Sequence, residues 1–233
     1  MLTETSILGV RITTTPQQPL WHYLIQQLHA EASERPIIVF TPNPEILVAA
    51  RRHNTFQTVL NTADVLLPDG QGTVWASRGA IQTVVTGVDT MFALLDYANQ
   101  HQLTVGVCYN PAGLSSGSAI AAALQQRYSN CQVELTTTTF TKPAPALVIV
   151  ALGSPAQEQW VEHNRANLAN SRVVLTVGGG IDYLTGQQIR APLLFRTLKL
   201  EWLWRLIIQP HRFKRIWQAV VVFPWLVVQS WHK

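Results

Sequence analysis

Three of the few carboxylates in this chain stand where acid–base chemistry could occur. Asp69 follows an apolar stretch and precedes Gly70, so we expect it at a strand end where the chain turns sharply. A carboxylate in that place can accept a proton, although aspartate also forms such turns without any chemical role. Asp182, which follows three glycines, has the same two interpretations, and Glu158 could cap or charge the first turn of a helix.

The sequence contains no Asp-x-Asp pair. Asp64 and Asp89 have no aspartate at that spacing, so no carboxylate pair offers itself for a Mg²⁺ or Mn²⁺ diphosphate complex. Cys108 and Cys131 lack the spacing of metal ligands and suit a reducing compartment. We therefore predict a site without a metal ion and without another cofactor.

Capping residues and glycines at expected strand ends could hold a phosphorylated ligand. Thr41 or Asn43 can cap a helix that starts near Pro44, and Ser115 repeats that arrangement. Gly178–Gly180 would let the backbone approach a ligand closely. These glycines do not form G-x-G-x-x-G, and there is no P-loop, so a nicotinamide site is unsupported. Each cap taken alone commonly has no further role.

The basic residues concentrate in a C-terminal segment. Of 17 Lys and Arg residues, eight lie from Arg190 onward beside a single acid, Glu201, so this segment carries about +7 and the first 189 residues −3. It also holds five of the eight tryptophans and an apolar run at 219–228. This mixture is typical of a helix that lies on a membrane surface, and the alternative is a helix packed on the core with a solvated basic face. A nucleic-acid partner is not expected, because the tail is apolar and lacks a known motif.

Composition indicates a globular chain that hides part of its surface. Charged residues make up 13%, about half the usual share, and hydrophobic residues make up 47%. No stretch reaches the roughly 20 apolar residues that cross a bilayer. The first residues do not read as a signal peptide. We expect a cytoplasmic protein, peripheral at the inner face of the plasma membrane.

The elements that must position these residues alternate between strands and helices. Strands are expected at 37–40, 65–67, 103–107, 147–152 and 173–177. Helices are expected at 46–58, 89–100, 115–128 and 155–168. The alternation predicts an α/β, Rossmann-like, mainly parallel sheet with helices on both faces. We place the core at residues 1–191 and a helical, membrane-associating appendage at residues 192–233. Ligands of such sheets bind outside the carboxyl ends of the strands.

Nine short motifs run in order through residues 41–215. They are Thr41-Pro-Asn43, Leu67-Pro-Asp-Gly-Gln-Gly72, Val85-Thr-Gly-Val-Asp89, Ala151-Leu-Gly-Ser-Pro-Ala-Gln-Glu158, Val177-Gly-Gly-Gly-Ile-Asp182, Gly186, Arg190-Ala-Pro192, Leu200-Glu-Trp-Leu-Trp-Arg205 and Gln209-Pro-His-Arg212. Together they resemble the WecG/TagA/CpsF family of bacterial glycosyltransferases, the N-acetylmannosaminyltransferase-like enzymes of cell-wall and exopolysaccharide synthesis.

The resemblance implies transfer of a sugar, N-acetylmannosamine or a related hexose, from a UDP-sugar to a polyprenyl-diphosphate-linked sugar, with inversion at the anomeric carbon. By position, Asp69 resembles the family's catalytic base. The resemblance assigns the other site residues to substrate binding: Thr41, Asn43, Gln157, Glu158, Asp182 and Arg190. It also implies that three appendage arginines close over the active site: Arg205, Arg212 and Arg215.

The residue types suit this chemistry. Inversion needs one carboxylate that takes the proton of the acceptor hydroxyl, and the departing diphosphate needs cations, for which the guanidinium fork is well shaped. Arg212 and Arg215 are therefore expected to act in catalysis beside Asp69. If they lie on a membrane-bound tail, membrane binding and activity are coupled.

The sequence departs from the family pattern at three places. The 108–113 loop replaces a glycine-rich one, Val84 stands where an arginine is common, and Ala156 replaces a lysine. The alternative function is therefore a catalytically degenerate nucleotide-binding α/β protein that docks on the membrane or on a polysaccharide-synthesis complex. The donor sugar, the acceptor sugar, the polymer and the oligomeric state stay open.

Overall fold

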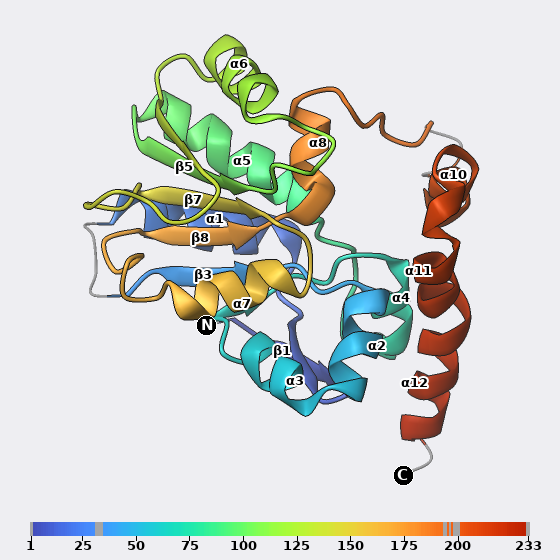
Figure 1. The fold of residues 1–233 in the computed structure, drawn as a ribbon. Helices are drawn as coiled ribbons and strands as arrows, with labels where there is room; N and C mark the ends of the chain where they lie inside the picture. Colours follow the sequence, from blue (N-terminus) through green and yellow to red (C-terminus); the bar gives the residue numbers. More distant parts are fainter. Residues whose placement is uncertain (1, 31–34, 193–194, 196, 198–200, 232–233) are drawn as a thin grey trace.

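The core of the chain is a six-stranded, all-parallel sheet in the order β4-β3-β8-β7-β5-β6 (Figure 1). The computed structural model describes residues 2–30, 35–192, 195, 197 and 201–231, except the side chains at 201, 205 and 211. The strands are β3 (Ile37–Phe40), β4 (Val65–Leu66), β5 (Thr104–Tyr109), β6 (Gln132–Thr136), β7 (Leu147–Ala151) and β8 (Val173–Thr176). The predicted α/β class, and each of the five predicted strands, is confirmed.

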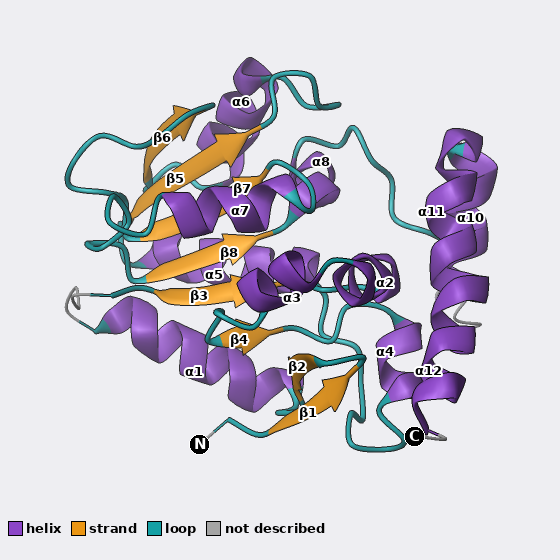
Figure 2. Cartoon of the chain, turned by 60° about the horizontal axis from the view of Figure 1, so that its bottom comes forward, coloured by secondary structure: helices purple, strands orange, loops and turns teal. Residues whose placement is uncertain are grey.

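Helices cover both faces of this sheet because its strands are apolar on both sides. Successive side chains of a strand point to opposite faces. Ile38 and Phe40 therefore pack under one group of helices, and Val39 packs under the other. The first group is α2 (Pro44–Arg52), α3 (Asn54–Leu60) and α7 (Ala156–His163), and the second is α1 (Gln17–His29), α5 (Gly87–Gln100) and α6 (Gly117–Arg127). Figure 2 shows α7 in front of the sheet and α5 behind it.

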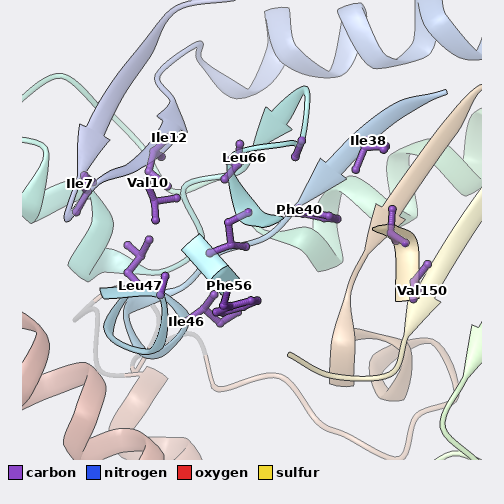
Figure 3. Packing of buried hydrophobic residues seen from close by; sticks show 14 of the residues in the cluster. Ile7, Val10, Ile12, Ile38, Phe40, Ile46, Leu47, Phe56, Leu66 and Val150 are labelled. Carbon is purple, nitrogen blue, oxygen red and sulfur yellow. The ribbon is translucent and has the colours of Figure 1, made fainter. Parts of the chain in front are cut away.

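A short hairpin that the sequence analysis did not predict extends the first apolar cluster. β1 (Glu4–Ile7) and β2 (Val10–Thr13) pair antiparallel through a two-residue turn in which Leu8 and Gly9 both have positive φ, 53° and 86°. Ile7, Val10 and Ile12 of the hairpin join the cluster of Phe40, Leu47 and Phe56 (Figure 3).

Two of the predicted helices were wrong in their extent. The helix expected over 46–58 is two helices, because His53 adopts an extended backbone between α2 and α3. The helix expected over 155–168 ends at His163. The edge strand β6 was missed because its side chains are exposed or only half-buried, which weakens its apolar signal.

The C-terminal segment is a column of short helices along α2 and α4 (Gln71–Ala76), seen in Figures 1 and 2. It comprises α10 (Glu201–Ile208), η2 (Pro210–Arg212), α11 (Phe213–Trp217), the π-helical η3 (Gln218–Val222) and α12 (Phe223–Trp231). The predicted helical tail is confirmed. Among the described helices, none is long and apolar enough to span a membrane.

In the described part of this tail, the buried side chains form a narrow stripe. Phe223 and Val227, one helical turn apart, are 0% and 1% exposed and enter the same apolar cluster as Phe40. A Cβ added at Gly72 would lie 2.7 Å from Pro44 and 3.3 Å from Phe223, so α4 approaches α2 and α12 closely. The domain boundary at residue 192 stays a prediction, and the tail shares the core's packing.

Candidate active site

A cavity of about 310 Å³ lies at the carboxyl ends of β3 and β4, under the C-terminal column. The core contributes the polar part of its lining: Asn43, Glu45, Asp69, Thr86 and Asp89. Tyr183 of α8 (Ile181–Leu184) and Arg190 add to this wall. The tail closes the cavity with Trp202, Ala219 and Val220. Its position agrees with the rule that ligands of such sheets bind beyond the strand ends.

The turn after β4 places Asp69 on this cavity. The Asp69 amide donates to Leu67 O at 2.9 Å, and Gly70 follows with φ +94°, a conformation that glycine adopts without strain. A Cβ added at Gly70 would also lie 3.3 Å from Pro44 Cδ. The Thr73 hydroxyl then donates to Gly70 O at 2.7 Å as α4 begins. The half-buried Asp69 carboxylate is thus held on a fixed turn.

The turn after β3 separates the roles of Thr41 and Asn43. Asn43 is the cap of α2, since its Oδ1 accepts from the Ile46 amide at 3.0 Å, and it lines the cavity. Thr41 is buried, and its hydroxyl donates to Thr176 O at 3.1 Å. Thr41 therefore joins the ends of β3 and β8 behind the cavity and does not line it.

The 86–89 turn orients an arginine on the cavity wall. Thr86 caps α5 by accepting from the Asp89 amide at 3.0 Å, and its hydroxyl donates to Asp89 Oδ2 at 2.7 Å. The other oxygen of Asp89 accepts a short hydrogen bond from Arg190 Nη2. Arg190 also lies over the Tyr183 ring, with its Cζ 5.9 Å from the centroid. Asp89, which lies 101 residues earlier in the chain, thus holds the Arg190 guanidinium in place.

Two tail arginines reach the core at this site. Arg215 forms a forked pair with Glu45, from Nε to Oε2 at 2.6 Å and from Nη2 to Oε1 at 3.2 Å. Arg212 Nη2 lies 4.0 Å from the point where a Cβ on Gly179 would stand. Arg205 lies in α10, and its side chain is outside the described part of the chain. The tail thus brings positive charge to the strand ends.

A second polar group lies deeper, at the ends of β7 and β8. Gln157 and Glu158 are 2% and 0% exposed, and Gln157 Nε2 donates to Glu158 Oε1 at 2.8 Å. Burial raises the pKa of the Glu158 carboxyl above its ordinary value, and hydrogen bonds from Gln157 and Ser154 oppose that shift. Gln157 Oε1 has no hydrogen-bond partner among the described residues. It lies 3.5 Å from the position of a Cβ on Gly178.

Asp182 belongs to this deeper group. It is 5% exposed and accepts from the Ser115 hydroxyl at 2.6 Å, while Ser115 also contacts the Thr185 hydroxyl at 2.7 Å. The prediction that Ser115 caps a helix was wrong, because Ser116 caps α6 through the Ala119 amide. A Cβ added at Gly179 would lie 3.3 Å from Asp182 Oδ2 and 4.0 Å from Arg212 Nη2, so both side chains approach the glycine loop.

Some site residues were not predicted. Glu45, Thr86, Tyr183 and Trp202 line the cavity, and so does Asp89, to which the sequence analysis assigned a place in a motif but no role in the site. The Thr86-x-x-Asp89 spacing before an apolar helix is a recognisable capping signal. The Cys108–Gly113 loop does not line the cavity, but Val84 does. Among the described residues, no three His, Cys, Asp or Glu side chains are grouped so that they could hold a metal ion.

Known proteins resemble this chain over most of its length. Residues 5–233 match the glycosyl transferase WecG/TagA/CpsF family. The chain is 29% identical over 244 residues to an N-acetylglucosaminyldiphosphoundecaprenol N-acetyl-beta-D-mannosaminyltransferase of Staphylococcus aureus, which covers 99% of this chain and 94% of the relative. A protein of the same name from Bacillus subtilis is 30% identical over 209 residues, covering 84% and 78%. The chain therefore belongs to the glycosyl transferase WecG/TagA/CpsF family.

Proposed function

We propose that this protein transfers N-acetylmannosamine or a related hexose from a UDP-sugar to a polyprenyl-diphosphate-linked sugar, with inversion, during bacterial cell-surface polysaccharide synthesis. The carrying observation is that Asp69 stands on a strand-end cavity that an arginine-bearing tail closes. The names of the relatives support a lipid-linked acceptor and an N-acetylmannosaminyl donor. The proposed place of action is the inner face of the plasma membrane.

Asp69 is the proposed general base. In a single displacement, the acceptor oxygen forms a bond to C1 of the donor sugar while the bond from C1 to the diphosphate oxygen breaks. The acceptor proton passes to the Asp69 carboxylate, and UDP leaves with the bonding electron pair. One carboxylate is sufficient for this reaction, and Asp69 is held on a rigid turn beside the cavity.

Arginines are the proposed partners of the departing diphosphate. Arg212 lies near the Gly178–Gly180 loop, and Arg190 lines the cavity. Guanidinium groups stabilise the charge of a leaving phosphate through forked hydrogen bonds. Arg215, which Glu45 holds, adds positive charge and fixes α11 over the site. On this proposal the reaction requires no metal ion.

The donor contacts are proposed for the other residues. Asn43 lines the cavity directly, while Thr41 shapes the strand ends from behind. The free oxygen of Gln157 beside Gly178 could accept a hydrogen bond from the donor. Glu158 accepts a hydrogen bond from the Gln157 amide, and Asp182 accepts one from the Ser115 hydroxyl. The proposed role of both carboxylates is to hold the residues around the Gly178–Gly180 loop. Arg205 is proposed as a further diphosphate contact.

A donor screen tests the proposal. Purified protein is mixed with individual UDP-sugars and a short-chain polyprenyl-diphosphate-linked N-acetylglucosamine, and the released UDP is measured. Release that depends on the acceptor supports the function. UDP-sugar binding without release or transfer by any donor would favour the alternative, a degenerate nucleotide-binding protein that docks on the membrane or a synthesis complex.

A further inference from the structure

A second hollow lies between the C-terminal end of α2 and the tail. Its volume is about 420 Å³, and its accessible lining is almost entirely apolar. Phe213, Trp217 and Val222 form this lining, with Arg52 and Lys214 beside them. Phe213 and Trp217 are 56% and 51% exposed, and their ring centroids lie 6.1 Å apart. Large exposed aromatic side chains around a hollow mark a binding surface.

Two cations, Arg52 and Lys214, lie at this groove. In the described part of the chain, no carboxylate forms an ion pair with Arg52 or Lys214. Arg215, the neighbour of Lys214, differs because it pairs with Glu45. The sequence also contains no Asp or Glu from residue 202 to residue 233. The groove thus joins an apolar surface to two cations that are available to an anion.

We propose that this groove binds one anionic phospholipid of the bilayer. Its phosphate would lie between Arg52 and Lys214, and one acyl chain would lie along Phe213 and Trp217. Charge complementarity selects this occupant, because an uncharged lipid leaves both cations unpaired, a zwitterionic lipid brings a cation of its own, and a soluble anion leaves the apolar lining exposed. The proposal rests on the membrane location given under the proposed function.

The bound phosphate would add a second connection between α11 and α2. Arg215 already joins α11 to Glu45, in the first turn of α2. Arg52 is seven residues further on, which is about 10 Å along a helix. A phosphate shared by Lys214 and Arg52 would hold α11 at the other end of α2. The lipid would therefore stabilise the tail in the position that closes the active-site cavity.

A monomeric lipid tests the groove without the general attraction of a charged bilayer. Full-length protein is titrated with dihexanoyl phosphatidylglycerol below its micelle concentration, and binding is followed by tryptophan fluorescence and calorimetry. We expect saturable binding at one site. Dihexanoyl phosphatidylcholine should bind at least about tenfold more weakly, because its choline cation opposes the pairing of its phosphate with Arg52 and Lys214. Inorganic phosphate should bind at least as weakly, because it has no acyl chain for the apolar lining.

Matched variants assign the site. Arg52→Gln with Lys214→Gln should weaken phosphatidylglycerol binding at least about tenfold, since two charge-assisted contacts are lost. Trp217→Ala should weaken it as well. Arg51→Gln removes the same charge from the adjacent residue of α2, which does not line this groove, and should leave binding unchanged. Thermal unfolding of each variant checks that the fold is intact.

Three outcomes would overturn the proposal. They are no saturable binding to the wild type, an equal loss in Arg51→Gln and in the double variant Arg52→Gln with Lys214→Gln, and binding of farnesyl diphosphate in preference to phosphatidylglycerol. The last outcome would assign the groove to the prenyl chain of the acceptor. Because no activity is measured, a failed donor screen would leave this result intact, and a failed lipid titration would leave the donor screen intact.

Discussion

The sheet core and the C-terminal column bury their apolar side chains to very different extents. Strands β7 and β8 are buried along their whole length, with helices packed on both sides. In the described column, Phe223 and Val227 are the buried side chains, while Trp217 is 51% and Trp225 is 59% exposed. The core is held by its own packing. One buried stripe and polar contacts such as Arg215 with Glu45 hold the column. Its position should therefore change more easily with its surroundings than the position of the core elements does.

The candidate active site is built from both regions. The core supplies Asp69 and Asn43 on rigid turns, and the column supplies Trp202 and Val220 as one wall of the cavity. Changes in the core should therefore affect the chemical step. Changes in the column should affect whether the site is closed, and the following variants separate these two effects.

The largest effect is expected for Asp69→Asn in the core. Loss of the general base should lower turnover by about 10²–10⁴-fold, while UDP binding and the unfolding temperature stay near those of the wild type. Acceptor-dependent UDP release and calorimetric UDP titration measure the two properties. Turnover close to that of the wild type would exclude Asp69 as the base.

A smaller loss is expected when the column loses its polar connection to the core. Arg215→Glu places two carboxylates together at Glu45 and should lower turnover by about 10²-fold, because the cations near the leaving diphosphate are displaced. The swapped pair Glu45→Arg with Arg215→Glu restores the attraction and should recover part of the activity. If the swap recovers nothing, Arg215 acts directly on the substrate and not through Glu45.

The core was largely predictable from local sequence, whereas the site depended on contacts between distant residues. The strand Ile37–Phe40 was predicted with its observed bounds, because four apolar residues end at a turn. The pairing of Arg190 with Asp89 and of Ser115 with Asp182 joins residues 101 and 67 positions apart, and no local pattern contains such information. For Thr41, the motif gave its position in the sequence but not its burial. That burial depends on the neighbouring strand β8, where Thr176 O accepts its hydrogen bond.

The sequence predicted only part of the structure of the column. Its apolar run at 219–228 predicted a helix on a surface, yet Phe223 and Val227 turn inward while Trp225 is exposed. That choice of face depends on the shape of α2 and α4 beneath it, which composition does not encode. The membrane contact itself stays a prediction.

Phe223→Ala tests how firmly the buried stripe holds the column. The loss of a fully buried aromatic ring should lower the free energy of unfolding by up to about 3–5 kcal/mol, measured by denaturant titration. Trp225→Ala, a change at an exposed position of the same helix, should stay within about 0.5 kcal/mol of the wild type. Equal effects of the two substitutions would mean that α12 does not pack on the core through Phe223.

A modest pH effect is expected from Glu158 in the core. Burial raises its pKa above the ordinary value of 4.5, so the folded protein binds the proton more tightly than the unfolded chain. The stabilisation from this protonation is therefore lost as the pH rises from about 4.5 through the folded-state pKa. Glu158→Gln should remove this dependence, which unfolding curves across that range would reveal. A wild type whose stability rises relative to the variant over the same range would contradict the assignment.

The smallest effect is expected on chelation. With arginines as the partners of the leaving diphosphate, saturating EDTA should leave the rate within about twofold of the untreated enzyme, because no hard-cation ligand pair is evident in the sequence. The measurement is acceptor-dependent UDP release with and without added Mg²⁺ or Mn²⁺. Strict dependence on either ion would show that the arginines do not replace a metal.

The anomeric configuration of the product tests the central claim most directly. The single-carboxylate mechanism at Asp69 predicts that an α-configured UDP-sugar yields a β-linked product, which the one-bond carbon–proton coupling at C1 reports by NMR. A β linkage would agree with direct displacement assisted by one base. An α-linked product would contradict it, because retention requires a second displacement or a different course at C1, and the role given to Asp69 would then be wrong.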